Sequence, residues 1–209
     1  MASESKICSI VRDELDLSSL EYARLAENAL VIGGVPWEKY NGILTPYSAP
    51  HVPVNVDRDE LAETLERNKM LLACWATDWD MLSDSQWWWI VCDMDQYDVH
   101  RVDSSRGRRS IRRGLNKCIV ERLGFYDFLG LSYPVHSEAL KGYGLAVPNE
   151  EQYAEEIATL ARNPGNHFWG AFVDEQMAAY LVCRVLDGVC RLVTTGSSKE
   201  LKKHNPMAA

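Results

Sequence analysis

The sequence predicts an α+β (mixed α/β) fold in which a largely antiparallel central sheet is flanked by helices. Two helical patterns in the second half of the chain are followed by three strand-length apolar runs, and the short polar turns between these runs favour an antiparallel meander. Hydrophobic residues make up 46% of the 209 positions and charged residues 25%, a balance typical of a globular chain long enough to bury a core.

Glycines and prolines recur through the first third of the chain, so we expect little regular structure there apart from helices. Ser18 or Ser19 can cap a helix within residues 18–30. Asp57 marks the start of a second helix, which should end near Asn68.

Strands are expected on both sides of a basic segment. Dense apolar and aromatic residues cover 70–77 and 86–92 and indicate two adjacent buried strands, and residues 118–123 indicate a short one. Between them, Ser104 or Ser105 can cap a helix whose arginines face solvent. The residues of this segment that should face inward are Ile111, Leu115 and Cys118.

The second half predicts two helices, three strands and a final turn. The helices are expected over 133–143 and 149–162, and the strands over 167–173, 177–186 and 189–195. Asn149 and Gln152 form a capping box for the second helix, and Asp187-Gly188 predicts a tight hairpin. Ser197-Ser198 should cap a helical turn that runs through Lys202.

The net charge is −8, which disfavours DNA and acidic membranes as partners of the whole molecule. Residues 101–122, however, hold eight Lys or Arg and two acidic residues, whereas the rest of the chain holds 14 basic and 28 acidic residues. This helix is either a solvated face, a nucleic-acid surface or a binding surface for a phosphorylated small molecule. The candidate substrate- or phosphate-binding residues are Arg109, Arg112, Arg113 and Lys117.

Six cysteines include no Cys-x-x-Cys pair. Cys74, Cys92, Cys183 and Cys190 lie in apolar runs, so buried thiols are favoured over disulfides or zinc ligands. The first residues lack the basic and apolar regions of a signal peptide, and no apolar run approaches the roughly 20 residues of a membrane-spanning helix. We therefore expect a cytoplasmic protein with no membrane span.

Most strong catalytic motifs are missing from the sequence, including the Gly-x-Ser-x-Gly elbow, the Walker loop and His-Glu-x-x-His. Asp-x-Asp occurs at 57/59, 78/80 and 93/95, a pattern that can hold a divalent ion against a diphosphate. Acidic residues of this kind are more often solvated turn residues, so we expect no metal site.

Three runs carry a family resemblance: Trp-Trp-Trp-Ile-Val at 87–91, Ser-Arg-Gly-Arg-Arg-Ser-Ile-Arg-Arg-Gly-Leu at 105–115, and Gly-Ala-Phe-Val-Asp-Glu-Gln-Met-Ala-Ala-Tyr at 170–180. The first two, with Asp98-Val99 between them, resemble the GNAT superfamily, in particular its Fem-like (peptidoglycan-bridge aminoacyltransferase-like) branch. The third resembles the strand, turn and strand at the centre of a GNAT lobe. Thr194 to Ser198 resembles the end of that lobe's fourth strand.

This resemblance implies two GNAT-like lobes, 1–105 and 106–209, the second truncated after its fourth strand. It implies a GNAT-like N-acyltransferase that moves an acyl or aminoacyl group from acyl-CoA or aminoacyl-tRNA to an amine. The family's pyrophosphate loop, Gln/Arg-x-x-Gly-x-Gly/Ala, has no complete copy here, and its nearest match lies at Arg162–His167. We therefore expect neither donor to be bound tightly, and the short chain can be inactive on its own.

No catalytic residue is assigned by the sequence. Glu138, Tyr143 and His167 are candidates for the base that an amine acceptor requires. The alternative function is a non-catalytic GNAT-like scaffold that binds a partner, or a second copy of itself, through an exposed sheet edge.

Overall fold

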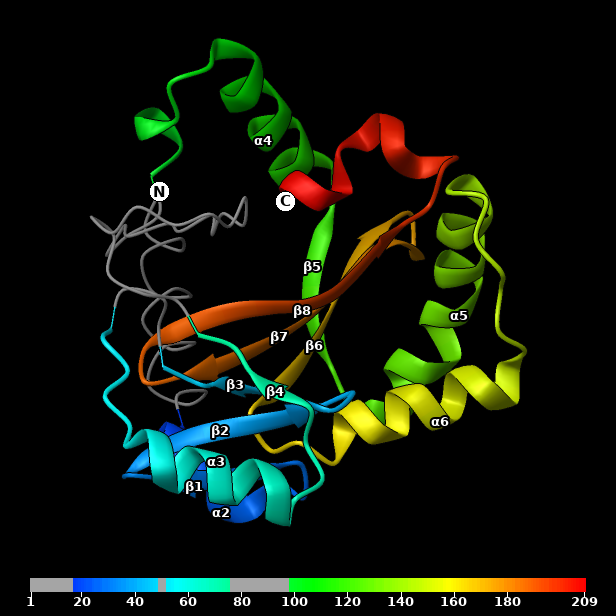
Figure 1. The fold of residues 1–209 in the computed structure, drawn as a ribbon. Coiled ribbons are helices and arrows are strands. Elements are labelled where there is room, and N and C mark those ends of the chain that lie inside the picture. The colour runs from blue at the N-terminus through cyan, green and yellow to red at the C-terminus, as the bar shows by residue number, and fades with distance from the viewer. Residues whose placement is uncertain (1–16, 49–51, 76–97) are drawn as a thin grey trace.

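The computed structural model describes residues 17–48, 52–75 and 98–209, which form two four-stranded sheets flanked by helices (Figure 1). The sheet orders are β1-β2-β3-β4 and β5-β6-β7-β8. The strands are β1 (Ala29–Ile32), β2 (Val35–Tyr40), β3 (Ile43–Pro46), β4 (Leu72–Ala73), β5 (Ile119–Leu123), β6 (Asn166–Val173), β7 (Gln176–Leu186) and β8 (Val189–Ser197). The α-helices are α2 (Ser19–Leu25), α3 (Arg58–Arg67), α4 (Ser105–Lys117), α5 (Phe125–Gly142) and α6 (Glu150–Ala161). The predicted α+β fold is confirmed.

The first sheet corrects the expectation of an irregular N-terminal third. β1, β2 and β3 form an antiparallel meander, and β4 adds to β3 in parallel. Gly33-Gly34 and Asn41-Gly42 make the two hairpin turns, and all four residues have positive φ angles. Two-residue turns of this kind match the twist of the strands they join. The glycines therefore connect strands in this region.

The two N-terminal helices begin where the sequence predicts. Ser18 caps α2, which ends at Leu25 because the chain turns into β1, and this is earlier than the predicted residue 30. Asp57 caps α3, where its Oδ1 accepts the N–H groups of residues 59 and 60, and Asn68 ends the helix. The predicted strand over 70–77 is shortened to Leu72–Ala73 in the described residues, while the one expected over 86–92 lies outside them.

The second sheet confirms the predicted meander. β6, β7 and β8 pair antiparallel in sequence order, and β5 pairs antiparallel with β6. Asp174-Glu175 and Asp187-Gly188 make the turns with positive φ angles. Gly196 on β8 is needed for packing, because a Cβ there would lie 2.3 Å from the ring of Tyr180.

The helices α5 and α6 cover one face of the second sheet (Figure 1). The core between them includes the fully buried Phe128, Tyr153 and Val182. The sequence places the start of α5 near residue 133, but the helix begins at Phe125 and contains Pro134. Proline cannot donate to the carbonyl four residues earlier, and Gly130 at that position is exposed, so water can hydrate its carbonyl. The predicted capping box at Asn149 and Gln152 is confirmed.

The helix α4 packs its glycine side against the C-terminal turns η2 (Leu201–His204) and η3 (Pro206–Ala208), which lie beside it in Figure 1. Ser104 caps it as predicted. Cys118 is buried and Ile111 half-buried, but Leu115 is 47% exposed, which corrects its inward placement. Gly114 is buried instead, because the C-terminal backbone passes too close for a side chain at that position.

The final turn begins later than predicted. Leu201 is the first residue of η2, and Ser198 contributes its Oγ, which accepts the N–H of Leu201 at 3.4 Å. Within the described residues, no helix has the length and apolarity needed to span a membrane.

A buried arginine joins the two sheets. Arg184 on β7 is 6% exposed, and its Nη1 lies 3.0 Å from the Oε1 atom of Glu38 on β2. Its Nε donates to the Oδ1 atom of Asn166 at 2.9 Å. The guanidinium carbon lies 5.1 Å and 5.5 Å from the ring centroids of Tyr22 and Tyr47. This polar centre attaches the first sheet to the second, and Arg191 on β8 adds a further link by donating from Nη2 to the carbonyl of Tyr47 at 3.1 Å.

Replacing Gly114 by alanine should destabilise the fold and displace residues 205–209. An added Cβ would lie 2.7 Å from the carbonyl oxygen of Asn205 and 2.8 Å from the amide nitrogen of Ala209. We expect the free energy of unfolding in urea to fall by about 1–3 kcal/mol. The matched control is Gly130→Ala in α5, where nothing lies within 4 Å of the new Cβ, and stability should rise by up to about 1 kcal/mol. Equal effects at the two sites would contradict this packing.

Candidate functional site

The helix α4 carries the basic residues that the sequence analysis selects. At about 100° per residue, Arg109, Arg113 and Lys117 fall with Arg106 within an arc of about 80°. All four side chains are exposed, and among the described residues none has a carboxylate within 4.0 Å. We call these four residues the basic stripe. Arg112 is also exposed but lies outside the stripe, with its Nη2 3.5 Å from Nδ1 of His100.

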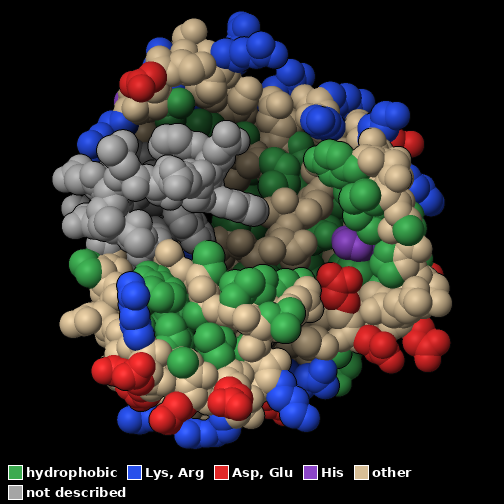
Figure 2. Space-filling view, in the orientation of Figure 1, with side chains coloured by type: hydrophobic (Ala, Val, Ile, Leu, Met, Phe, Trp, Pro, Cys, Tyr) green, Lys and Arg blue, Asp and Glu red, His purple; other side chains and the backbone are tan. Residues whose placement is uncertain are grey.

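The other arginine of α4 is structural. Arg108 is half-buried, and its Nη1 donates to the carbonyls of Val102 and Asp103, the latter at 3.0 Å. It thereby closes the turn that leads into α4. The stripe lies on a different side of α4 from Gly114, which contacts the C-terminal turns, and Figure 2 shows Lys and Arg side chains along this upper edge of the molecule. The structure thus brings three of the four candidate residues into one unpaired cationic surface.

A groove of about 620 Å³ begins where the basic stripe ends, at Lys117. Its charged lining is otherwise acidic and comes from three elements: Glu121 on β5, Asp127 on α5, and Asp174 and Glu175 in the turn between β6 and β7. The apolar lining consists of Ile119, Leu123, Leu131 and Phe172. We call this space the β5 groove. Sequence analysis missed it because its carboxylates lie up to 54 positions apart in the chain and meet only in the folded sheet.

A polar cluster lies between α5 and the second sheet. Nδ1 of His136 lies 2.7 Å from the hydroxyl oxygen of Tyr180, and the imidazole stacks on Tyr153 with 4.6 Å between ring centroids. The Tyr153 hydroxyl donates to Ser132 Oγ at 2.8 Å, and that hydroxyl in turn donates to the carbonyl of Phe128. Burial raises the pKa of Tyr153 to about 12 and lowers the pKa of His136, which the nearby Glu156 carboxylate opposes. His136 is therefore held neutral near pH 7.

The three candidate bases differ in their exposure and in their contacts. Tyr143 ends α5 and is 82% exposed. His167 is 6% exposed, and its Nδ1 lies 3.2 Å from Nη2 of Arg122. Glu138 lies beside the end of β8, where its Oε1 accepts the backbone N–H of Lys199 at 2.9 Å. Of the three, Glu138 alone is next to the end of the fourth strand of this sheet.

The nearest match to a pyrophosphate loop is excluded by its position. Arg162 is the C-cap of α6, and the residues after it turn directly into β6. The C-terminal end of a helix carries partial negative charge, which repels phosphate. Residues 162–167 therefore do not form an anion cradle.

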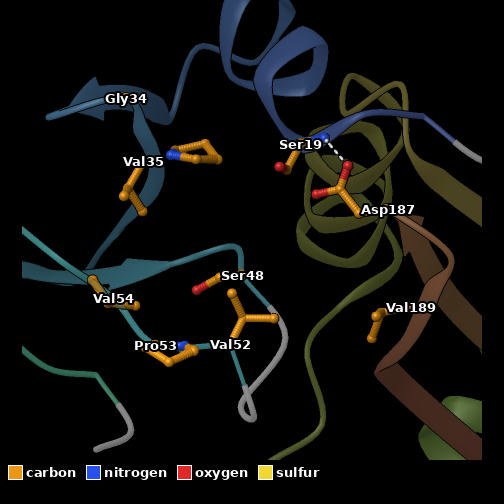
Figure 3. Close-up of a pocket in the computed structure, with 10 residues that line it drawn as sticks. Ser19, Gly34, Val35, Ser48, Val52, Pro53, Val54, Asp187 and Val189 are labelled. Atoms are coloured by element: carbon orange, nitrogen blue, oxygen red, sulfur yellow. Dashed lines mark hydrogen bonds between the residues drawn. The ribbon is translucent and has the colours of Figure 1, made fainter.

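The charged residue that lines the pocket in Figure 3 has a structural role. This pocket encloses about 290 Å³ between the first sheet and the turn that joins β7 to β8. Asp187, the one charged residue among the described lining residues, accepts the backbone N–H of Ser19 at 3.1 Å. The other described lining residues are apolar, glycine or serine, so this part of the chain supplies no second charged group to the pocket.

Two of the cysteines form a hydrogen-bonded pair on β7 and β8. Cys183 is buried as expected, whereas Cys190 and Cys74 are exposed, which corrects the expectation for these two thiols. Cys92 lies outside the described residues. The bond from Cys183 lowers the pKa of Cys190 to about 7. Cys183 itself has a raised pKa, because of its hydrogen bond with Cys190 and its burial.

No family model matches this chain, and no curated protein matches it. Among solved structures it is similar to the PaiA N-acetyltransferase from Thermoplasma acidophilum in complex with coenzyme A, with 18% sequence identity and a TM-score of 0.31. The match covers 40% of this chain and 60% of that chain. A likeness at this level carries no argument about activity.

Stability should depend on pH through His136. Its pKa is lowered in the folded state, so the unfolded chain binds more protons at this residue as the pH falls below about 7. The free energy of unfolding should therefore decrease from about pH 7 to about pH 5. His136→Asn, which keeps an acceptor near the Tyr180 hydroxyl but does not titrate, should lose part of this slope. The exposed His100→Asn serves as the control, and an equal change of slope in both variants would contradict the assignment.

Proposed function

We propose that this chain forms part of a GNAT-like N-acyltransferase. The observation that carries the proposal is the order of elements in the second half: β5, two helices, then β6, β7 and β8 in one antiparallel sheet. The sequence resemblance equates β8 with the fourth strand of a GNAT lobe, and β8 is the fourth strand of this sheet. The division into lobes 1–105 and 106–209 and the Fem-like branch remain predictions.

The basic stripe is the surface on which a phosphate-bearing acyl donor would bind in this proposal. Arg109, Arg113 and Lys117 are exposed and have no carboxylate partner among the described residues, and guanidinium groups bind phosphate with paired hydrogen bonds. The backbone N–H of Lys199, just after the fourth strand, is already bonded to the Glu138 carboxylate. This amide is therefore not free to bind a phosphate, which agrees with the expectation of weak binding of acyl-CoA. Acyl-CoA and aminoacyl-tRNA are both retained as donors.

Glu138 is the base that we propose for the acceptor amine. Its carboxylate lies beside the end of β8, and its second oxygen is available to accept a proton from an attacking amine. Tyr143 is too exposed for a dry reaction site, and His167 is buried with its Nδ1 in contact with Arg122.

The test is acetyl transfer from millimolar acetyl-CoA to lysine peptides and polyamines, followed by mass spectrometry. The wild-type chain should acylate an amine faster than the uncatalysed reaction, and Glu138→Gln should reduce the rate by about 100-fold or more.

Combined replacement of Arg109, Arg113 and Lys117 by glutamine should raise KM for the donor and leave stability within about 1 kcal/mol, because these side chains are exposed. Arg67→Gln on α3 is the matched control, since this arginine has only an exposed pairing with Glu63.

The result that opposes the proposal is a wild-type rate equal to the uncatalysed rate with both acetyl-CoA and aminoacyl-tRNA. The second candidate, a non-catalytic GNAT-like scaffold, would then hold. One observation favours it: among the described strands β5 pairs with β6 alone, which leaves its outer edge open.

A further inference from the structure

We propose that the β5 groove binds an extended, lysine- or arginine-bearing segment of a partner protein, which adds to β5 as a further strand. This inference concerns a docking surface and does not depend on acyl transfer. It rests on three observations: the open edge of β5, the apolar residues that line the groove, and the excess of carboxylates in the same lining.

The edge of β5 supplies the backbone part of the site. Its five residues pair with β6 on one side, and no other described strand pairs with them. Ile119 is 66% exposed and Val120 44% exposed, so apolar side chains at this edge face water. An exposed strand edge presents N–H and C=O groups on which an extended peptide can form a ladder.

The groove supplies the specificity. Ile119, Glu121 and Leu123 alternate along β5 and share the face that forms the groove. Among the described residues that line the groove, four are acidic (Glu121, Asp127, Asp174 and Glu175) and one, Lys117, is basic. A partner strand whose alternate side chains are basic would place those side chains among the carboxylates and its backbone along β5.

A second copy of this chain fits the same edge poorly. An antiparallel pair of β5 strands centred on Glu121 would set the two Glu121 carboxylates opposite one another. Like charges at directly opposite positions destabilise a strand pair. A nucleic acid would likewise be repelled by the four carboxylates of the groove. Charge therefore selects a basic peptide.

The experiment uses the full chain and a fluorescein-labelled nine-residue peptide in which lysine and valine alternate. Fluorescence anisotropy should show saturable binding, and the same peptide with glutamate in place of lysine should not bind. Glu121→Lys should weaken binding by about tenfold or more. Glu66→Lys on α3 makes the same charge change at another exposed position and should leave the affinity within about twofold. Asp174→Asn is a second variant, which removes one negative charge from the groove. It should leave the turn intact, because asparagine tolerates the positive φ at that position.

Hydrogen exchange separates strand addition from a general electrostatic attraction. Bound peptide should slow exchange of amides within residues 119–123. Equal loss of affinity in the Glu121 and Glu66 variants, or no added protection in β5, would overturn the proposal. Self-association of the chain that is abolished by Glu121→Lys would assign the edge to a second copy and would overturn it as well.

Discussion

The arrangement of this protein depends on the burial of one charged side chain. Arg184 lies near the C-terminal end of β7, a strand whose other residues are almost all apolar, and removing a guanidinium from water is costly unless its hydrogen bonds are met inside. Glu38 and Asn166 meet them, and the rings of Tyr22 and Tyr47 flank the cation. Burial by itself would lower the pKa of Arg184, but the Glu38 carboxylate together with Tyr22 and Tyr47 outweighs it and keeps the pKa above its ordinary value. The first sheet must therefore dock in the one position that brings Glu38 to this site.

Local rules predict much of this fold from the sequence. The capping box at Asn149 and the hairpin at Asp187-Gly188 were predictable because each depends on residues within a few positions of one another. Asn41-Gly42 forms a turn of the same kind in the first sheet. Because many other glycines and prolines surround it, this turn was not recognised in the sequence as a hairpin. The early start of α5 at Phe125 was not predicted, and this helix contains Pro134, a residue that more often marks a helix boundary.

Non-local features could not be predicted in the same way. The basic stripe was visible in sequence because α4 is one continuous helix, although the separation of Arg108 and Arg112 from the stripe required the structure. The β5 groove combines β5, α5 and a distant turn, so no spacing in the sequence reveals it. Together the two surfaces give an acidic protein a cationic helix that ends at an anionic groove, with Lys117 common to both. A phosphate-bearing donor and a basic peptide would thus occupy neighbouring but distinct surfaces.

The central structural claim is that Arg184 and Glu38 form one unit that attaches the first sheet to the second. A double-mutant cycle with Arg184→Met and Glu38→Leu, followed by urea unfolding, tests it most directly. Each single replacement should cost about 3–5 kcal/mol, because the remaining partner is left as an uncompensated buried charge. The double variant should then cost far less than the two single changes added together. Additive losses, or single losses below about 1 kcal/mol, would contradict the claim.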